Sequence, residues 1–533
     1  MNWLHTLPAC CEVLRPYQRQ QVREIADAVE QGCRKVLAQM PTGAGKTHVI
    51  AAITAAASHA GLRVLIVATR TKLVRQIHER LESFGTEHGV IAASLPDLLR
   101  MNCTVQVASA DTLYRRALVD GRMPLLPTDV IIFDEAHLAA ADSRVAIINA
   151  YPNALLVGFS ATPARKSGLT LNAIFDRLIL GPGTLELIAM GMLVKPRIFN
   201  VPVMSVDDLR ALPKDATSDY QAGELGHFMS RPKLVGDVVS NWLRIANGKP
   251  TVAFAASKSH GAEIVMALSR VGVSAELLTD QDDEDRREAV IKRLEDGETT
   301  VVVNCFLLAY GVDLPSVECI VLARPTRSLP MFLQMTGRGL RPAPGKDSCI
   351  LIDHGRVVEH LGLPTLEFSW SLDVGHNVNQ SAREVQRRLA VSEKPRTCPE
   401  CKYTWTVSEE GSRCTSCGWA PQPKQRPVTT IRADLVDLDG HARPVAAHSL
   451  EVTTFYTEAI TWYARRWPQR WIEKPKSGRW WAWSQTRTKF QISDAVKMPG
   501  RFWEAEPASS VSPAVAGWLQ HSIIKFAKQR QTA

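Results

Sequence analysis

The sequence lacks any run of 18 or more apolar residues, the length that a helix needs to cross a bilayer, so we expect no membrane partner. Its first residues, Met1 to His5, also lack the basic head and apolar stretch of a secretory signal. No compositional extreme is present, since 45% of the residues are hydrophobic and 22% are charged. These absences exclude disordered, fibrous and collagen-like classes and, by elimination, favour a globular cytoplasmic protein.

Acidic residues are scarce in the last third of the chain. Residues 376–533 hold 24 Lys or Arg against 14 Asp or Glu, whereas residues 1–375 hold 39 against 40. Such an excess of positive charge suits a polyanionic partner, because phosphate contacts release counterions. A basic surface that only aids solubility would give the same counts, so charge alone leaves both interpretations open.

Most of the 11 cysteines are scattered among apolar neighbours, which indicates buried thiols in a reducing compartment. The exceptions are two C-x-x-C pairs, Cys398 with Cys401 and Cys414 with Cys417, separated by 12 residues. This is the ligand set of a tetrahedral zinc ribbon with four cysteine ligands, which we place at residues 395–420. Because four thiolates leave no position for water, a bound Zn²⁺ would be structural.

Short β-branched, apolar runs alternate with amphipathic segments through the first 350 residues. Such runs are typical of strands that are buried on both faces of a parallel sheet. We expect strands at 64–67, 130–133, 155–157, 251–254, 301–303 and 319–322, and helices at 17–31, 71–84 and 257–271. The alternation predicts an α/β fold with helices on both faces of each sheet.

A length of 533 residues predicts two to four domains. Residues 201–232 carry prolines, glycines and acidic residues without a sustained pattern, and we place the connection between two α/β lobes there. The lobes then span residues 1–200 and 233–375. A Pro-rich linker follows the cysteine pairs. A basic, Trp-rich C-terminal module then occupies residues 430–533.

Residues 42–47 read Thr-Gly-Ala-Gly-Lys-Thr and lie between an expected strand and a helical stretch. Glycines such as Gly43 and Gly45 let backbone amides turn onto phosphates, and the following helix N-terminus adds its positive end. Lys46 would reach the β- and γ-phosphates of ATP, and the Thr47 hydroxyl would ligate Mg²⁺. The pattern therefore predicts the phosphate-binding loop of an ATPase.

A second element of the ATP site, Asp134 and Glu135, directly follows the apolar run 130–133. The carboxyl ends of parallel strands are where α/β sheets present ligand-handling residues. We assign Asp134 to the Mg²⁺ that bridges the β- and γ-phosphates, and Glu135 to the attacking water. Alone, such a pair is more often a solvated strand end, but the upstream phosphate loop favours catalysis.

These residues resemble the superfamily 2 helicases, and the resemblance covers about residues 13–345. The DEAH sequence at 134–137 is the family's motif II, and residues 40–47 look like motif I in a form that has Met40 in place of the first Walker glycine. Gln18 follows Leu-Arg-Pro-Tyr and looks like the adenine-reading element. The resemblance implies two tandem RecA-like lobes that use ATP and Mg²⁺.

Further motifs of the first half match in the family's order. Residues 160–163, Ser-Ala-Thr-Pro, resemble motif III, which links the ATP state to lobe movement. Residues 69–76 resemble motif Ia, and residues 109–113 lie where another strand-contacting element is found. The resemblance implies coupling roles for His137, Ser160 and Thr162, and nucleic-acid contacts for Thr69, Arg70 and Thr112.

In the second half, residues 310–315 resemble motif V and residues 334–341 resemble motif VI, with the pattern Q-x-x-G-R-x-x-R. The roles implied are nucleotide contacts for Gly311 and Asp313, and catalytic roles for Arg338 and Arg341. Arginines placed against the transition-state oxygens stabilise phosphoryl transfer. Since they belong to the second lobe, hydrolysis would require the lobes to close on ATP.

The C-terminal module holds eight tryptophans after residue 440, among them Trp480, Trp481 and Trp483, with many Lys and Arg neighbours. Aromatic rings stack on bases and cations hold phosphates, so single-stranded nucleic acid is a natural partner. A small core packed from large aromatics is the slightly favoured interpretation for most of these tryptophans. Both interpretations can hold together.

The motifs look most similar to the branch with type III restriction motor subunits and phage or prophage replication helicases. This favours a DNA helicase or translocase in a bacterial or phage-infected cytosol. An RNA helicase would use the same engine. Two other classes stay open, an ATP-gated binding or loading factor and a restriction nuclease subunit, although no paired-carboxylate nuclease pattern follows residue 376. The sequence identifies no protein partner.

Overall fold

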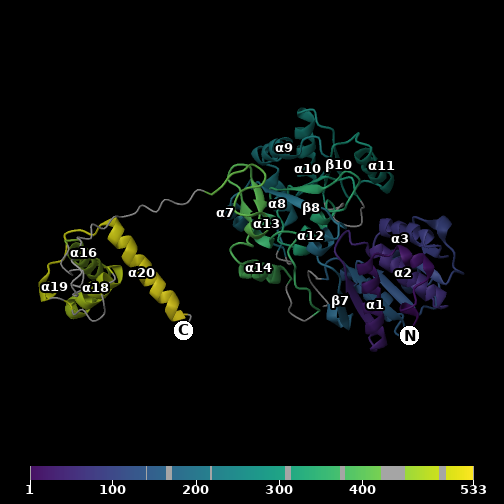
Figure 1. The fold of residues 1–533 in the computed structure, drawn as a ribbon, viewed down its shortest axis with the longest axis horizontal. Helices are drawn as coiled ribbons and strands as arrows, with labels where there is room; N and C mark the ends of the chain where they lie inside the picture. The colour runs from purple at the N-terminus through teal and green to yellow at the C-terminus, as the bar shows by residue number, and fades with distance from the viewer. Residues whose placement is uncertain are drawn as a thin grey trace, which may run out of the picture. The chain divides into compact units, whose positions relative to one another are not determined.

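The chain divides into two compact units, Met1–Pro423 and Lys424–Ala533 (Figure 1). The computed structural model describes residues 2–139, 141–163, 171–215, 219–305, 314–372, 378–421, 450–490, 492, 498 and 500–531. Within these ranges, no helix is both long enough and apolar enough to span a membrane.

The first lobe is built on a seven-stranded sheet in which every pairing is parallel. Strands β2, β5 and β6 are buried along their whole length, as their β-branched and apolar sequences require. The strand order is β3 (Gly89–Ile91), β4 (Val105–Ser109), β2 (Val64–Ala68), β5 (Val130–Asp134), β6 (Leu155–Ser160), β1 (Lys35–Gln39) and β7 (Arg177–Leu180). The three strands predicted in this lobe are confirmed.

Helices pack against this sheet and carry the site residues at their N-termini. Helix α2 begins at Lys46 and is buried almost all round, because its small side chains allow close packing. The strongly amphipathic α3 begins directly after β2. The main helices are α1 (Pro16–Glu30), α2 (Lys46–His59), α3 (Thr71–Ser83), α5 (Asp142–Asn149) and α6 (Thr184–Ala189).

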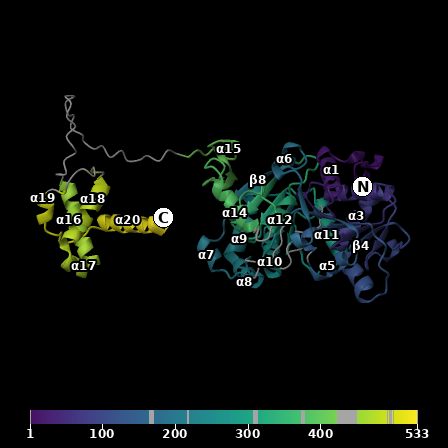
Figure 2. The same ribbon diagram turned by 90° about the horizontal axis from the view of Figure 1, so that it is seen from below.

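The second lobe has an eight-stranded sheet whose first six strands are parallel. Its order is β10 (Ala275–Leu278), β11 (Val301–Asn304), β9 (Thr251–Phe254), β12 (Cys319–Leu322), β13 (Ser348–Asp353), β8 (Lys195–Asn200), β15 (Tyr403–Trp405) and β14 (Arg396–Thr397). Its main helices are α9 (Pro232–Ala246), α10 (Lys258–Arg270), α11 (Glu284–Glu295), α12 (Leu329–Gly337), α13 (Val357–Leu361) and α14 (Val378–Arg388). The α/β fold with two tandem parallel-sheet lobes is therefore confirmed (Figures 1 and 2).

Strand β8 lies in a segment that we expected in the first lobe, which was predicted to extend to residue 200. The structure instead pairs it with β13, from Lys195 opposite Ser348 to Asn200 opposite Asp353. The chain therefore passes from the first sheet to the second before Lys195. The sequence of β8 predicts a strand, but it cannot say which sheet completes its backbone hydrogen bonds.

The stretch 201–232, expected as a connection, contains the helices α7 (Val206–Ala211) and α8 (Ala222–Met229). These helices bury an apolar cluster with the start of α9, which includes Leu209, Tyr220 and Leu225. Asp219 ties the segment to the second lobe, because its carboxylate accepts hydrogen bonds from the Thr326 hydroxyl and the Arg327 amide, both at 2.8 Å. Residues 201–232 are thus a folded part of the second lobe in addition to a link.

The second unit is helical where the structure describes it. Its core gathers aromatic side chains, and Tyr456, Trp483 and Phe502 are completely buried. The helices are α16 (Leu450–Arg466), α17 (Pro468–Glu473), α18 (Pro475–Phe490), α19 (Gly500–Glu504) and α20 (Pro513–Gln531). The interpretation of most tryptophans as core residues agrees with this packing.

Candidate active site and zinc centre

The phosphate loop connects β1 to α2 and needs glycine at two positions. Gly43 and Gly45 have φ angles of 88° and 80°, in the left-handed region that other residues rarely adopt. A Cβ atom at Gly43 would also lie 2.8 Å from Leu193 Cδ2. Met40, at the position of the first Walker glycine, is completely buried, so its side chain packs in the core and leaves the loop open.

Gln18, at the start of α1, supports this loop from behind. Its side-chain amide donates to the Ala44 carbonyl at 3.0 Å, and its Oε1 accepts from the Arg15 amide at 3.0 Å. The Tyr17 hydroxyl donates to the same Ala44 carbonyl at 3.0 Å. The structure therefore shows Gln18 holding the loop, and its contact with adenine stays a prediction.

The two acidic residues of the DEAH sequence are buried beside the loop. Asp134 is the last residue of β5, and Glu135 has a φ of 51°, a left-handed conformation that turns the chain sharply. Burial raises the pKa of Asp134 to about 6, and the negative charge of Glu135 contributes to this rise. Burial also acts to raise the pKa of Glu135, but the charges of Lys46, His137 and others outweigh it and lower that pKa. Lys46 thus acts electrostatically on both carboxylates.

A chain of polar contacts runs from Glu135 towards the second lobe. His137 Nδ1 lies 3.3 Å from Glu135 Oε2 and 3.1 Å from Ser160 Oγ. Ser160 Oγ accepts from the Thr162 amide at 3.2 Å. The amide of Gln334 then donates to Thr162 Oγ1 at 3.3 Å. Because Gln334 lies in α12, this series of contacts connects Glu135 to the second lobe.

The arginines of motif VI also come to this site. Arg338 is 95% buried, and its charge lowers the pKa of Glu135 after the larger effects of Lys46 and His137. Arg341 packs on the phosphate loop, since a Cβ at Gly43 would lie 3.4 Å from its Cγ. A Cβ at Gly337 would lie 2.7 Å from Thr42 Cβ. The structure therefore brings the predicted catalytic groups of both lobes together.

Two predicted nucleotide contacts, Gly311 and Asp313, lie outside the described residues. The predicted nucleic-acid contacts follow the ends of β2 and β4. Thr69 is partly exposed and Arg70 is exposed, at the start of α3. Thr112 is partly exposed, and its hydroxyl accepts from the Ala93 amide at 3.3 Å. These three residues therefore share the edge of the first sheet with the ATP site.

Sequence reasoning missed a contact between the lobes near Arg70. Arg75 of α3 forms an ion pair with Glu288 of α11, with 2.8 Å between Nη1 and Oε1. Burial lowers the pKa of Lys72, also on α3, while the carboxylates of Glu284, Glu288 and Glu295 act to raise it. The acidic residues of α11 can be read from the sequence, but they do not indicate which helix they contact.

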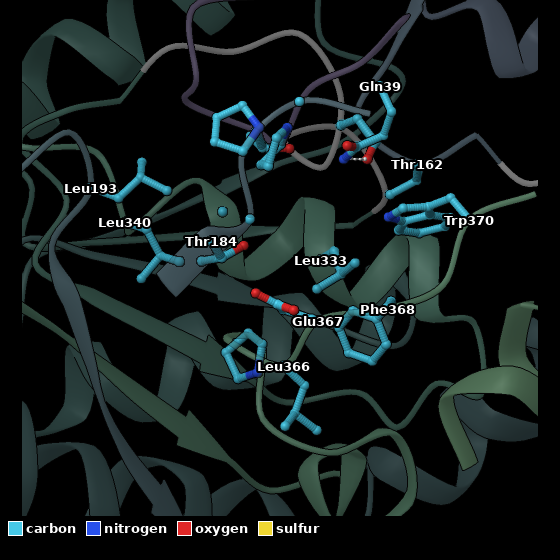
Figure 3. A pocket seen from close by; sticks show the side chains of 18 of the residues that line it. Gln39, Thr162, Thr184, Leu193, Leu333, Leu340, Leu366, Glu367, Phe368 and Trp370 are labelled. Atoms are coloured by element: carbon cyan, nitrogen blue, oxygen red, sulfur yellow. Dashed lines mark hydrogen bonds between the residues drawn. The ribbon is translucent and has the colours of Figure 1, made fainter. Parts of the chain in front are cut away.

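A cavity of about 240 Å³ lies next to the phosphate loop, between the lobes (Figure 3). Gln39 and Thr162 line it from the first lobe, and Leu333 and Leu340 from the second. Glu367, Phe368 and Trp370, from the segment after α13, close another side. Lys46 and the two DEAH carboxylates are not among its lining residues, so this cavity lies beside the predicted catalytic groups and does not contain them.

The four cysteines form one compact cluster. Their sulfur atoms all lie within 4.8 Å of one another, and the Cys398–Cys417 and Cys401–Cys414 pairs are each 3.6 Å apart. Tetrahedral Zn–S bonds of about 2.3 Å would set the sulfurs about 3.8 Å apart, so the donor set fits zinc.

The two C-x-x-C turns have matching backbone geometry. The Lys402 amide donates to the Cys398 carbonyl at 3.1 Å, and the Gly418 amide donates to the Cys414 carbonyl at 2.8 Å. Lys402 and Gly418 both have left-handed backbones, with φ of 67° and 78°. Two equivalent knuckles therefore present their thiols to one point.

The cysteine segment extends the second lobe's sheet. Strand β15 pairs antiparallel with β8, with Tyr403 opposite Phe199. Phe199, Tyr403 and Trp405 pack with Cys398 and Cys414 in one apolar cluster. Lys195 adds ion pairs to Glu410 at 3.1 Å and Glu409 at 3.5 Å, on the short helix α15 (Val407–Glu410). The segment is thus continuous with the lobe.

Two family descriptions match the chain. Residues 12–165 match "Type III restriction enzyme, res subunit", and residues 234–343 match "Helicase conserved C-terminal domain". The matches fall on the first and second lobes, in that order. They contain the phosphate loop, the DEAH residues and the motif VI arginines.

Relatives with this arrangement come from several sources. A Saccharomyces cerevisiae protein provisionally named as the ATP-dependent helicase IRC3 is 27% identical over 64% of this chain and 51% of its own length, so the chain spans about half of it. The "51.5 kDa protein" of a Lactococcus phage (isolate 7-9) is 27% identical over 71% of this chain and 77% of its own.

Among solved structures, a fragment provisionally named as an HsdR subunit of a type I restriction enzyme, from Vibrio vulnificus YJ016, has the same fold. It aligns with a TM-score of 0.54 and 21% identity, and covers 68% of each chain. The first lobe is therefore similar to the motor subunit of type III restriction enzymes and the second to helicase C-terminal domains, and the chain shares the fold of the restriction-enzyme fragment.

Proposed function

We propose that this chain is an ATP-driven DNA helicase or translocase. One observation carries the proposal. Lys46 and Glu135 of the first lobe and Arg338 and Arg341 of the second meet around one phosphate loop. A nucleotide held there would contact both lobes, so its binding and hydrolysis would change the relation between them.

Each group has a defined task in this proposal. The amides around Gly43 and Gly45 and the N-terminus of α2 hold the phosphates, and Lys46 neutralises their charge. Thr47 and Asp134 would hold Mg²⁺, which supplies charge stabilisation to the phosphates when it is bound. Glu135, whose pKa is lowered, stays ionised and can accept a proton from water. Arg338 and Arg341 stabilise the charge that develops on the transferred phosphoryl group.

The contacts among His137, Ser160, Thr162 and Gln334 are the coupling path that we propose. The hydrogen-bonded atoms of successive residues along this path lie 3.1 to 3.3 Å apart. All four residues are buried. A buried hydrogen bond costs free energy when it is broken without a new partner. Movement of the γ-phosphate near Glu135 would therefore shift these hydrogen bonds and displace Gln334 in the second lobe.

Variants of the two strongest site residues test the ATPase. Lys46→Ala and Glu135→Gln should each abolish the ATP hydrolysis that a DNA strand stimulates, because one removes the phosphate charge partner and the other the base. Arg244→Gln, an exposed change on α9, should leave hydrolysis unchanged. Near-wild-type turnover in either site variant would refute this assignment.

The substrate is tested separately. The restriction-enzyme match favours DNA, whereas the motor residues themselves do not distinguish the sugars. ATPase and unwinding should be measured on matched tailed duplexes of DNA and RNA. Stronger stimulation by RNA would establish the RNA helicase alternative. Stimulated ATPase without strand displacement or translocation would favour an ATP-gated binding or loading factor.

We also propose that Cys398, Cys401, Cys414 and Cys417 hold one structural Zn²⁺. The support is the sulfur spacing and the paired knuckle turns. Metal analysis of the purified chain should find about one zinc per chain. Cys414→Ser should lose the zinc and destabilise the edge at β8, whereas Cys103→Ser, outside the cluster, should keep it. A zinc-free chain with an intact fold would contradict the proposal.

A reducing cytosol is the compartment that we propose, because a thiolate zinc site needs reduced sulfur. DNA replication is the pathway that we propose first, on the resemblance to phage replication helicases. Replication of a phage or plasmid template should fail with Glu135→Gln and recover with the wild-type chain. Normal replication with the variant would exclude this pathway.

A further inference from the structure

Four exposed cations lie close together in the sequence around the short helix α17 of the second unit. We call this group the basic corner: Arg466 at the end of α16, Arg470 on α17, Lys474 after it, and Lys476 on α18. All four side chains are exposed, and none makes an ion pair or a side-chain hydrogen bond within the described part of the chain. Helix α17 packs against both α16 and α18, so the four residues lie on or next to helices that contact one another.

Two other charged side chains of this unit, Arg479 and Glu458, form hydrogen bonds within the fold. Arg479 donates to the carbonyls of Phe502 and Ala505, at 3.3 and 2.8 Å, and therefore serves the fold. Glu458 accepts from the Ser512 amide and hydroxyl, at 2.9 and 2.7 Å. Between residues 466 and 476 the only acidic residue is Glu473. The basic corner therefore has little compensating negative charge.

Two large apolar side chains are exposed beside these cations. Ile472 is 78% exposed on α17, and Trp480 is 50% exposed on α18. Trp480 lies one helical turn after Lys476, so the two side chains share a face of α18. Trp503 packs against the Trp480 ring at 6.1 Å with a 78° angle between the planes, which holds the ring in place. Most other tryptophans of the unit pack into its core.

Exposed like charges repel one another, and an exposed indole leaves its apolar ring faces in contact with water. Residues 450–531 hold 13 Lys or Arg against 6 Asp or Glu, so the unit as a whole reinforces the repulsion. A flexible polyanion with stacking groups would relieve both costs. Its phosphates would meet the cations, and one of its bases would stack on the fixed indole.

We propose that the basic corner and Trp480 bind single-stranded nucleic acid without regard to sequence. This inference rests on the proposed function and extends it, because it gives the helicase a second binding site for the strand, outside the two lobes. The recognition is by repeated phosphates and one stacked base. An acidic membrane surface would use the cations but gives the indole no planar partner for stacking.

The full-length chain can be tested with a labelled oligothymidine and fluorescence anisotropy over a range of salt concentrations. The test variant is R466Q/R470Q/K474Q/K476Q, which keeps polar side chains and removes four exposed charges. Affinity at about 100 mM salt should fall at least about tenfold, and the log–log salt slope should become shallower by about 2 to 3. The matched control is K233Q/R244Q/R270Q/K292Q, four exposed cations of the second lobe, and its affinity should stay within about twofold.

Stacking is tested at Trp480. W480A should weaken binding at least about fivefold with an unchanged salt slope, because a neutral contact is lost. W480F keeps an aromatic face and should bind nearly as well as the wild type. Thermal melting checks that each variant folds; unaltered melting is expected for the quadruple variant because its side chains are exposed, and at most a small loss for W480A, which removes the contact with Trp503.

Three results would overturn the proposal. Affinity and salt slope could be unchanged in the quadruple variant, or the matched control could lose as much as the test variant. The quadruple variant could also lose binding to phosphatidylserine vesicles and keep its affinity for oligothymidine, which would identify a lipid surface. If the wild-type chain shows no DNA-stimulated ATPase but the corner variants still lose affinity, the motor proposal fails and this one stands.

Discussion

At the scale of single residues, the left-handed turn at Glu135 does the most to shape the site. Residues other than glycine rarely adopt this conformation, and it persists where the surroundings fix it. The turn gives two carboxylates that are adjacent in sequence different environments. Asp134 remains at the strand end with a raised pKa, whereas Glu135 lies beside His137 with a lowered one. One position can thus serve a metal and the other a water.

Arg341 should act on the transition state more than on the bound nucleotide. Because its side chain reaches the phosphate loop from the second lobe, Arg341→Ala should reduce maximal turnover at least about a hundredfold and leave ATP affinity within about threefold. Steady-state ATPase and equilibrium ATP binding measure the two effects. An unchanged maximal rate with a large loss of ATP affinity would show that Arg341 only binds nucleotide.

Met40 shows what residue patterns can and cannot reveal about the site. The glycine, lysine and acidic positions were predictable, because backbone freedom and charge are properties of the residue itself. The tolerance of methionine in place of the first Walker glycine was not, since it depends on a core space that only the folded sheet creates. Met40 is completely buried there.

Replacing Met40 with the glycine of the Walker pattern should therefore lower the stability of the folded protein. Met40→Gly should lower the free energy of unfolding by about 2–5 kcal/mol, because it leaves a cavity in the core, and should not raise turnover. Met40→Leu, which nearly conserves volume, should cost less than about 1.5 kcal/mol. Chemical denaturation gives both values. Equal stability of the glycine variant and the wild type would show that the core closes around the gap.

At the scale of elements, the predicted strands were reliable because continuous apolar runs have few alternatives inside a parallel sheet. Their membership was less predictable. Strand β8 joins the second sheet, and the cysteine segment adds β15 to its edge. Both pairings depend on backbone hydrogen bonds between distant segments, which no local pattern encodes. The helices within 201–232 were missed because their apolar face is short and interrupted by Pro and Gly.

Two buried histidines, His260 on α10 and His354 directly after β13, should make the stability of the second lobe sensitive to acid. Burial lowers the pKa of His260 and of His354 to about 4, so both are neutral when folded and take up protons on unfolding. Their stabilisation is complete above the unfolded pKa of about 6.5 and is lost as the pH falls towards 4. Burial raises the pKa of Asp353 to about 6, and its contribution changes in the opposite direction.

Together these shifts should lower the stability of the second lobe by about 2 kcal/mol between pH 7 and pH 5. Hydrogen exchange of the amides in β9 and β12 at the two pH values measures it. His354→Asn keeps a donor for the Val201 carbonyl, 3.0 Å from His354 Nδ1, and should remove most of the loss. The same pH dependence in this variant would place the acid sensitivity elsewhere.

At the scale of the whole first unit, the lobes meet through contacts at the surface and through buried contacts. The surface ion pair between Arg75 and Glu288 is exposed on both sides and should be worth less than about 1 kcal/mol. The Thr162 and Gln334 side chains are buried, so breaking the hydrogen bond between them without a new partner costs more free energy than separating an exposed ion pair. The coupling between chemistry and movement should therefore depend far more on the buried contact than on the ion pair.

Removing the Thr162 hydroxyl should separate hydrolysis from unwinding. Thr162→Ala leaves the ATP-binding groups in place, so DNA-stimulated ATPase should stay within about threefold, while strand displacement should fall about tenfold because Gln334 loses its acceptor. Thr162→Ser keeps the hydroxyl and should unwind normally. Both rates are measured on one tailed duplex. If hydrolysis and unwinding fall by the same factor in Thr162→Ala, this bond belongs to the catalytic step and the lobes are coupled through another contact.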